Sequence, residues 1–120
     1  MNRVEFITTE SGTDLIVSFA IEGDGPGEVK SLTLLRTPKF EFVLDESERG
    51  PSVSYDDFED EDLDLLEFIE LHRDAVRITT RRREYTLDTH GVDRDEIRRA
   101  AEILQQMNFD RRFLLKVGSV

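Results

Sequence analysis

The chain of 120 residues contains no cysteine. This absence excludes disulfide frameworks, thiolate metal sites and cysteine nucleophiles. No apolar run approaches membrane-spanning length, and residues 1–10 lack the apolar core and the small-residue cleavage site of a secretion signal. We therefore expect a cytoplasmic protein.

Histidine is also scarce, because His72 and His90 are the only two in the chain. Neither lies in an HExxH motif or beside a serine in a nucleophile elbow. We expect His72 to end a strand and His90 to lie in the loop before a helix. The three glycines of residues 23–27 resemble a phosphate-binding loop, but Pro26 intervenes and a strand-like segment follows. A turn between strands is the better interpretation.

These absences leave little support for an enzyme. A chain with 27 acidic residues can contain a pair of carboxylates suited to glycoside cleavage, but abundance alone says nothing about their separation. We predict a protein that is not an enzyme, with no catalytic residue and no cofactor.

The composition favours a folded chain despite its high charge. Hydrophobic residues make up 38% and charged residues 36%, and the apolar residues recur in regular alternation. A length of 120 residues suits one core, so we expect a single domain over residues 1–120.

The net charge is −11, and most of it lies in the first half of the chain. Residues 1–60 carry five basic residues against fourteen acidic ones, a net of −9, whereas residues 61–120 carry eleven against thirteen, a net of −2. Such a field repels nucleic acids and anionic lipid headgroups and attracts basic surfaces. The expected partner is therefore a basic protein, and neither a nucleic acid nor a membrane.

The acidic segment, residues 55–64, is the most distinctive motif, with seven acidic residues among ten. Like charges at this density repel one another, so such a run is either a solvated loop or a surface for a positively charged partner. We predict a partner-binding site in which carboxylates attract the partner and two aromatic rings anchor it. Its residues are Tyr55, Asp56, Asp57, Phe58, Glu59, Asp60, Glu61 and Asp62.

Two other interpretations of the acidic segment stay open. Asp60-x-Asp62-x-Asp64 begins like a calcium-binding EF-hand loop, but that loop needs a glycine and a glutamate where this chain has Leu65 and Leu71. The EF-hand is excluded, which leaves weak, unselective binding of divalent cations or a solvated loop without a ligand. We predict no dedicated metal site.

The fold class expected from these patterns is α+β. Alternating apolar residues and turn signals predict a mainly antiparallel, strongly twisted sheet of about six to eight strands, either continuous or split in two. Strand-like segments are residues 4–9, 14–22, 31–36, 40–44, 52–55, 63–72, 75–80, 84–88 and 112–117. Residues 63–72 also fit a short helix, and we choose a strand because a turn and a clear strand follow them.

The segment at residues 40–44 is read as a strand from its alternation. Phe40 and Phe42 would point to one face of the sheet, and Glu41 and Val43 to the other.

One C-terminal amphipathic helix is predicted over residues 93–107 and is expected to pack on one face of the sheet. Asp93 can cap the first turn while Glu96 reaches back, and Val92 and Ile97 occupy the positions of a hydrophobic staple. A single apolar stripe follows, formed by Ile97, Ala100, Ala101, Leu104 and Met107.

The three arginines at residues 81–83 are expected at the tip of a hairpin. They can contact phosphate, but a structural role is the better interpretation. Such a tip either balances the charge of the acidic segment on the same surface or keeps an exposed strand edge from aggregating.

The order of strand patterns at residues 14–20, 31–36, 50–57 and 69–71, before a hairpin and a C-terminal helix, resembles a known family. It is similar to the small immunity proteins of bacterial polymorphic toxin systems, in particular the tenth such immunity family. The resemblance covers roughly residues 14–105 and includes the strand end Leu34-Leu35-Arg36. It implies a cytoplasmic α+β protein that binds and blocks a cognate toxin domain without chemistry of its own.

Two functional hypotheses follow. In the first, the chain is a non-catalytic, immunity-like inhibitor that blocks a basic partner, with a toxin domain as the candidate, through the acidic segment. In the second, it is a regulatory or assembly module that binds another protein through an apolar surface, with little dependence on salt.

Overall fold

The computed structural model describes residues 2–59 and 63–118, which form an α+β fold with one eight-stranded sheet and one main helix. The strands are β1 (Asn2–Ser11), β2 (Leu15–Glu22), β3 (Val29–Arg36), β4 (Ser52–Tyr55), β5 (Leu66–Leu71), β6 (Ala75–Thr80), β7 (Glu84–Asp88) and β8 (Leu114–Val117). The helix is α1 (Arg94–Met107), and two short 3-10 helices, η1 (Pro38–Val43) and η2 (Glu46–Glu48), lie between β3 and β4.

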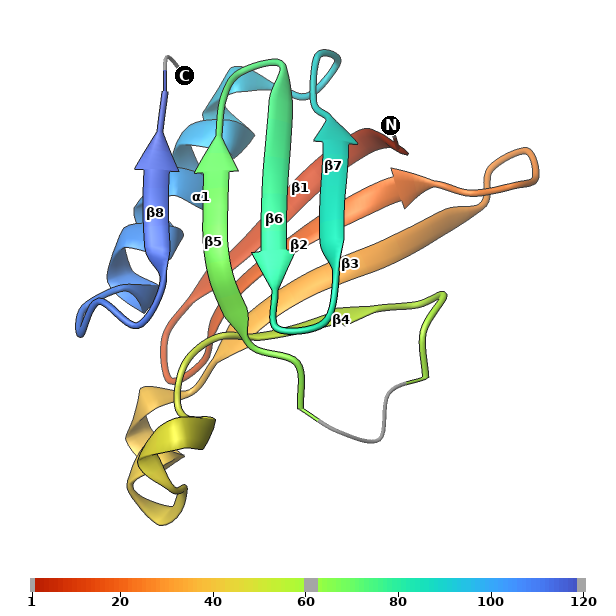
Figure 1. Ribbon diagram of the computed structural model, residues 1–120. Coiled ribbons are helices and arrows are strands. Elements are labelled where there is room, and N and C mark those ends of the chain that lie inside the picture. Colours follow the sequence, from red (N-terminus) through yellow and green to blue (C-terminus); the bar gives the residue numbers. More distant parts are fainter. Residues whose placement is uncertain (1, 60–62, 119–120) are drawn as a thin grey trace.

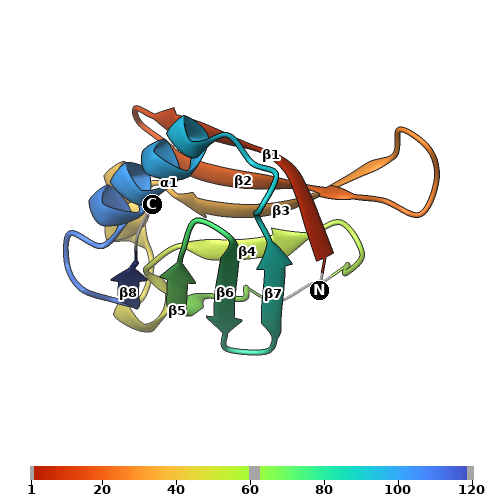
Figure 2. The ribbon, with the colours of Figure 1, turned by 90° about the horizontal axis from the view of Figure 1, so that it is seen from above.

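The strands follow the order β4-β3-β2-β1-β7-β6-β5-β8 in the sheet. The pairs within β1–β4 and within β5–β7 are antiparallel, whereas β1 pairs with β7 and β5 pairs with β8 in parallel. Figure 2 shows the two halves of the sheet as facing layers, with α1 across one end. The sheet is therefore mixed but mostly antiparallel, and it curls around the core.

The two halves also meet where β4 and β5 begin. The backbone N–H of Val53 donates to the carbonyl of Asp64 at 2.8 Å, and the N–H of Leu66 donates to the carbonyl of Pro51 at 2.9 Å. These bonds hold the start of β5 against the start of β4, whereas the acidic segment leaves the sheet at the opposite end of β4, after Tyr55 (Figure 1).

The core follows from the alternation of apolar residues along the strands. In β2, Val17, Phe19 and Ile21 are almost completely buried. In β1, Val4 and Ile7 are both buried although they are three residues apart, because the register shifts between Val4 and Phe6. Without that bulge, the period of two would turn one of the two side chains to solvent.

The helix α1 packs on β1 and β2 through the predicted stripe, and Ile97, Ala100, Leu104 and Met107 are fully buried. The carboxylate of Asp93 caps the first turn by accepting from the N–H of Asp95 at 2.8 Å. The predicted contact of the Glu96 side chain with the cap residue is replaced by a contact between α1 and β1. Its carboxylate accepts the N–H of Ile7 in β1 at 2.7 Å.

The α+β class is confirmed, and so are the predicted helix and the choice of a strand within residues 63–72. The strand predicted at residues 40–44 is wrong, because this segment belongs to the 3-10 helix η1. Pro38 stands in the first turn, and the N–H of Phe40 donates to the carbonyl of Thr37 at 3.2 Å. The predicted alternation of faces is wrong as well, since Glu41 is buried whereas Val43 is exposed together with Phe40 and Phe42.

In the part of the chain that the structure describes, no helix combines the length and apolar character needed to cross a membrane.

Candidate functional site

The acidic segment connects β4 to β5, and its first residues form a tight turn. Tyr55 is the last residue of β4, and its carbonyl accepts the N–H of Phe58 at 2.9 Å. Three of the predicted site residues, Asp60, Glu61 and Asp62, lie outside the described residues.

The two predicted aromatic anchors differ in exposure. Tyr55 is only 9% exposed and packs edge-on against Phe58 and Tyr85, with ring centroids 5.8 and 5.9 Å away. Burial, and then the nearby carboxylate of Asp57, raises the pKa of the Tyr55 hydroxyl. Phe58 is 42% exposed, and the guanidinium of Arg83 lies 3.8 Å from the centre of its ring. Tyr55 therefore belongs to the core and supports Phe58 from beneath.

The first carboxylates of the segment contact β3. Asp56 accepts the backbone N–H of Ser31 at 2.8 Å, and Asp57 forms a 2.9 Å ion pair with Lys30. Lys30 also contacts Asp24 at 3.2 Å, and hydrogen bonds from its ammonium to Asp57 and then Asp24 raise the pKa of Lys30. The Asp56 and Asp57 side chains nevertheless stay at the surface, as does Glu59.

Asp64 turns inward, unlike the acidic residues at the start of the segment. It is 3% exposed, its carboxylate accepts the Thr80 hydroxyl at 2.7 Å, and it also accepts the backbone N–H of Arg82 at 3.2 Å. This carboxylate joins the start of β5 to the β6–β7 turn. It is a structural acceptor and not part of a binding surface.

The arginine-rich tip predicted at residues 81–83 lies between β6 and β7 and contacts the surrounding loops. Arg81 donates to the carbonyl of Ser47 at 2.6 Å, and Arg83 covers Phe58. The tip thus contacts the acidic segment through the Phe58 ring and through the Arg82 N–H bond to Asp64, and the predicted pairing of its charges with the segment's carboxylates stays a prediction.

A surface pocket of about 550 Å³ lies beside the acidic segment. The β2–β3 loop, the turn after β4 and the start of β7 contribute its walls, which include Lys30, Asp57, Phe58 and Arg83. Its basic groups are engaged with the chain's own carboxylates and aromatic rings.

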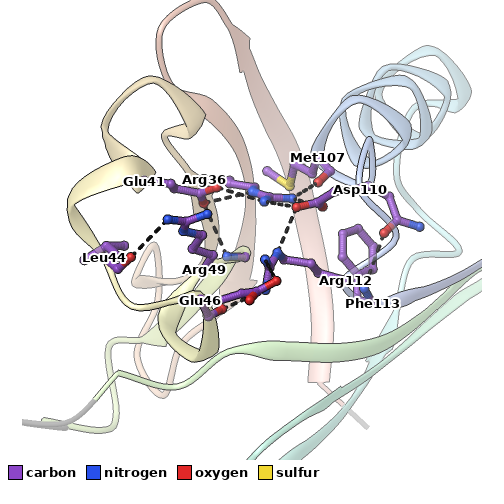
Figure 3. A network of polar contacts seen from close by, with 11 residues as sticks. Arg36, Glu41, Leu44, Glu46, Arg49, Met107, Asp110, Arg112 and Phe113 are labelled. Atoms are coloured by element: carbon purple, nitrogen blue, oxygen red, sulfur yellow. Dashed lines mark hydrogen bonds and ion pairs between the residues drawn. The ribbon is translucent and has the colours of Figure 1, made fainter.

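A second charged cluster, which the sequence analysis missed, is centred on Arg36 at the end of β3 (Figure 3). Arg36 is 1% exposed and makes five hydrogen bonds, which matches its five N–H donors. Two go to Glu41 at 2.9 and 2.8 Å, two go to Asp110 at 2.8 Å each, and one goes to the carbonyl of Met107 at 2.6 Å. The ring of Phe109 lies 4.2 Å from its guanidinium carbon.

Further contacts connect this cluster to its surroundings. Arg112 donates to Asp110 at 2.8 Å and to the carbonyl of Glu46 at 2.7 Å. The N–H of Gly50 donates to Glu41 at 3.3 Å, and Gly50 has a φ of +126°, a conformation that favours glycine. We call Arg36, Glu41, Asp110 and Arg112 the Arg36 cluster. It attaches η1 and the start of η2 to the C-terminal end of α1.

The pKa values of the cluster reflect this pairing. Hydrogen bonds from Arg36 lower the pKa of Asp110 to about 2, and Arg112 adds to the effect. Burial opposes ionisation of Glu41, but its bonds to Arg36 and to the Gly50 N–H outweigh burial and lower its pKa. Both carboxylates therefore stay charged at neutral pH.

An apolar surface on η1 is the second feature that the sequence analysis missed. Phe42 and Val43 are 74% and 70% exposed. Leu35, Phe40, Val43, Leu44 and Leu63 line a shallow groove of about 280 Å³ beside them. We call Leu35, Phe40, Phe42, Val43, Leu44 and Leu63 the η1 surface. The unusual Phe-x-Phe-Val-Leu run was its only sequence signal.

The two histidines lie where the sequence predicted. His72 follows β5 and contacts Glu70 at 2.9 Å, and this hydrogen bond lowers the pKa of Glu70. His90 precedes the helix cap and contacts Asp74 at 3.2 Å. Within residues 2–59 and 63–118, no three histidine or acidic side chains are grouped so as to hold a metal ion.

Comparisons with protein-family models, curated proteins and solved structures found no match for this chain. The resemblance to the immunity proteins therefore stays a prediction.

Proposed function

We propose that the protein is a non-catalytic binding domain that recognises a basic protein and blocks it, in the manner of the immunity proteins that its sequence resembles. The observation that carries the proposal is the net charge of −11, concentrated in residues 1–60. A field of that sign accelerates the encounter with a basic surface and disfavours acidic competitors.

The acidic segment is the proposed site of first contact. Asp56, Asp57 and Glu59 lie at the surface beside the half-exposed ring of Phe58. The contacts of Asp56 and Asp57 with β3 hold these carboxylates in place, which lowers the entropy lost when a partner binds. The chain's own Lys30 already pairs with Asp57, and Arg83 covers the ring of Phe58, so the segment supports attraction at long range more than tight pairing.

The experiment measures association with a basic protein at low and high salt, using the product of a neighbouring gene where that product is basic and toxin-like. Neutralising the surface with Asp56→Asn, Asp57→Asn and Glu59→Gln should slow association about tenfold at low salt and flatten its salt dependence. The matched control neutralises three exposed acids elsewhere, Glu10→Gln, Asp95→Asn and Glu102→Gln, and should retain most of the wild-type rate. Equal rates for both triple variants would contradict a steering role for the acidic segment.

A second candidate function is an assembly module that associates through apolar surface. The exposure of Phe42 and Val43 in η1 favours it. Binding that hardly changes between low and high salt would support this second function over the first.

A further inference from the structure

The segment that contains η1 inverts the usual arrangement of side chains. It buries the carboxylate of Glu41 and exposes Phe42 and Val43, although burying an apolar side chain is favourable and burying a charge is costly. The inversion is possible because Arg36 pairs with Glu41 through two hydrogen bonds. The apolar side chains are thus held outward by a specific buried ion pair.

The Arg36 cluster also makes the η1 surface rigid. It joins η1 to the end of β3 and to the loop after α1, and Arg49 adds a 3.2 Å bond to the carbonyl of Leu44. In Figure 1, η1 and η2 project from the sheet beside the start of β4. A rigid projection that presents apolar side chains loses little conformational freedom on binding, which is a property of preorganised docking surfaces.

The charge around the η1 surface indicates the chemistry of its partner. Asp45, Glu46 and Glu48 follow η1 after Leu44 and are exposed, Glu48 also lines the groove, and these three acids outnumber Lys39, the one basic residue of η1. A second copy of this chain would bring like charges together, because each copy carries a net charge of −11. Charge complementarity instead favours a partner with Lys or Arg beside its apolar residues.

The backbone of η1 indicates the shape of that partner. The N–H groups of Phe40 and Leu44 are bonded within the segment, to the carbonyls of Thr37 and Glu41. They are not available to extend a β-sheet, so recognition depends on side chains entering the groove. An amphipathic helix satisfies this requirement, with apolar residues one turn apart and basic residues at their flanks.

We propose that the η1 surface docks an amphipathic helix of the partner, with the helix's apolar side chains in the groove and its Lys or Arg side chains against Asp45 and Glu48. This inference rests on the proposed function only in that the partner is basic. It differs in placing the apolar anchor on η1 and not on the acidic segment.

The test uses a fluorescent Leu/Lys peptide of about 14 residues that forms an amphipathic helix, titrated with the full chain. Two control peptides replace either the leucines with serine or the lysines with glutamate. The Leu/Lys peptide should bind at least about tenfold more tightly than either control, since both the apolar face and the charge are required. Equal binding of the Leu/Lys and Ser/Lys peptides would overturn the proposal.

Variants of the chain locate the binding surface. Phe40→Ser with Val43→Ser should weaken peptide binding about tenfold, whereas Leu114→Ser, which alters an equally exposed leucine on β8, should leave it unchanged. Asp45→Asn with Glu48→Gln should flatten the salt dependence. An unchanged urea midpoint and circular dichroism spectrum confirm that each variant is folded.

Two outcomes separate this inference from the proposed function. Peptide binding that is insensitive to the Phe40 and Val43 substitutions, but lost when Asp56, Asp57 and Glu59 are neutralised, overturns docking on η1 and leaves the function in place. Dimerisation in sedimentation experiments that disappears in the Phe40/Val43 variant identifies a second copy as the occupant and also overturns the proposal.

Discussion

The Arg36 cluster and the acidic segment use carboxylates in opposite ways. Around Arg36, two carboxylates contributed by distant parts of the chain share one buried guanidinium. In the acidic segment, Asp56, Asp57 and Glu59 are adjacent in sequence and remain at the surface. The density of acids along the chain therefore indicates the electrostatic field around the protein. Their pairing in space decides what they contribute to stability.

Removing Arg36 is expected to have the largest effect. Arg36→Met should lower the free energy of unfolding by about 3–5 kcal/mol, because it leaves the buried Glu41 carboxylate uncompensated. Urea unfolding measures the loss. The double variant with Glu41→Leu should recover part of it, and a double variant as unstable as the single one would argue against an unpaired charge as the cause.

Asp64 offers a test inside the acidic segment itself. Asp64→Ala should cost about 1–3 kcal/mol of unfolding free energy, because the buried Thr80 hydroxyl and the Arg82 N–H lose their acceptor. Asp64→Asn keeps an oxygen acceptor and should cost less. If Asp64→Ala unfolded at the wild-type urea concentration, the inward orientation of Asp64 would be wrong.

Acid should weaken the Arg36 cluster through protonation of Asp110. The pKa of Asp110 is about 2 in the folded chain and about 3.9 when unfolded, so its stabilisation is present above about pH 4 and is lost as the pH falls towards 2. The loss should be about 1–2 kcal/mol after allowance for screening at this partly exposed group.

Unfolding measured in urea between pH 5 and pH 2 tests this acid response. Asp110→Asn should be less stable than wild type near neutral pH and should lose less stability on acidification. Parallel pH profiles for the two proteins would show that Asp110 does not carry the effect.

The smallest effect is expected at Glu59, an exposed member of the acidic segment. Glu59→Gln should change the free energy of unfolding by no more than about 0.5 kcal/mol. A substantially larger loss, measured by the same urea titration, would mean that this part of the segment has a structural role, as the paired carboxylates of the Arg36 cluster do.

Local patterns predicted most of the regular elements. The alternation in β2, the turn signals around residues 23–27 and the capped apolar stripe of α1 each specify an element through nearby residues alone. The segment at residues 40–44 was misread because its alternation suits a strand, while the ion pair between Arg36 and Glu41 holds it as a 3-10 helix.

The candidate site was predictable in composition and less so in arrangement. The density of acids located the segment, but nothing local indicated that Tyr55 and Asp64 would be buried. The Arg36 cluster had no sequence signal, because Asp110 lies 74 residues from Arg36 and the two meet only when α1 packs on the sheet.

By itself, the sequence determined most of the elements, the capped helix and the sign of the protein's electrostatic field, because each depends on neighbouring residues or on a sum over all charges. The tertiary structure alone decided which charges are paired and which apolar side chains face outward. Those outcomes depend on partners that only the curled sheet and the packed helix bring within hydrogen-bonding distance.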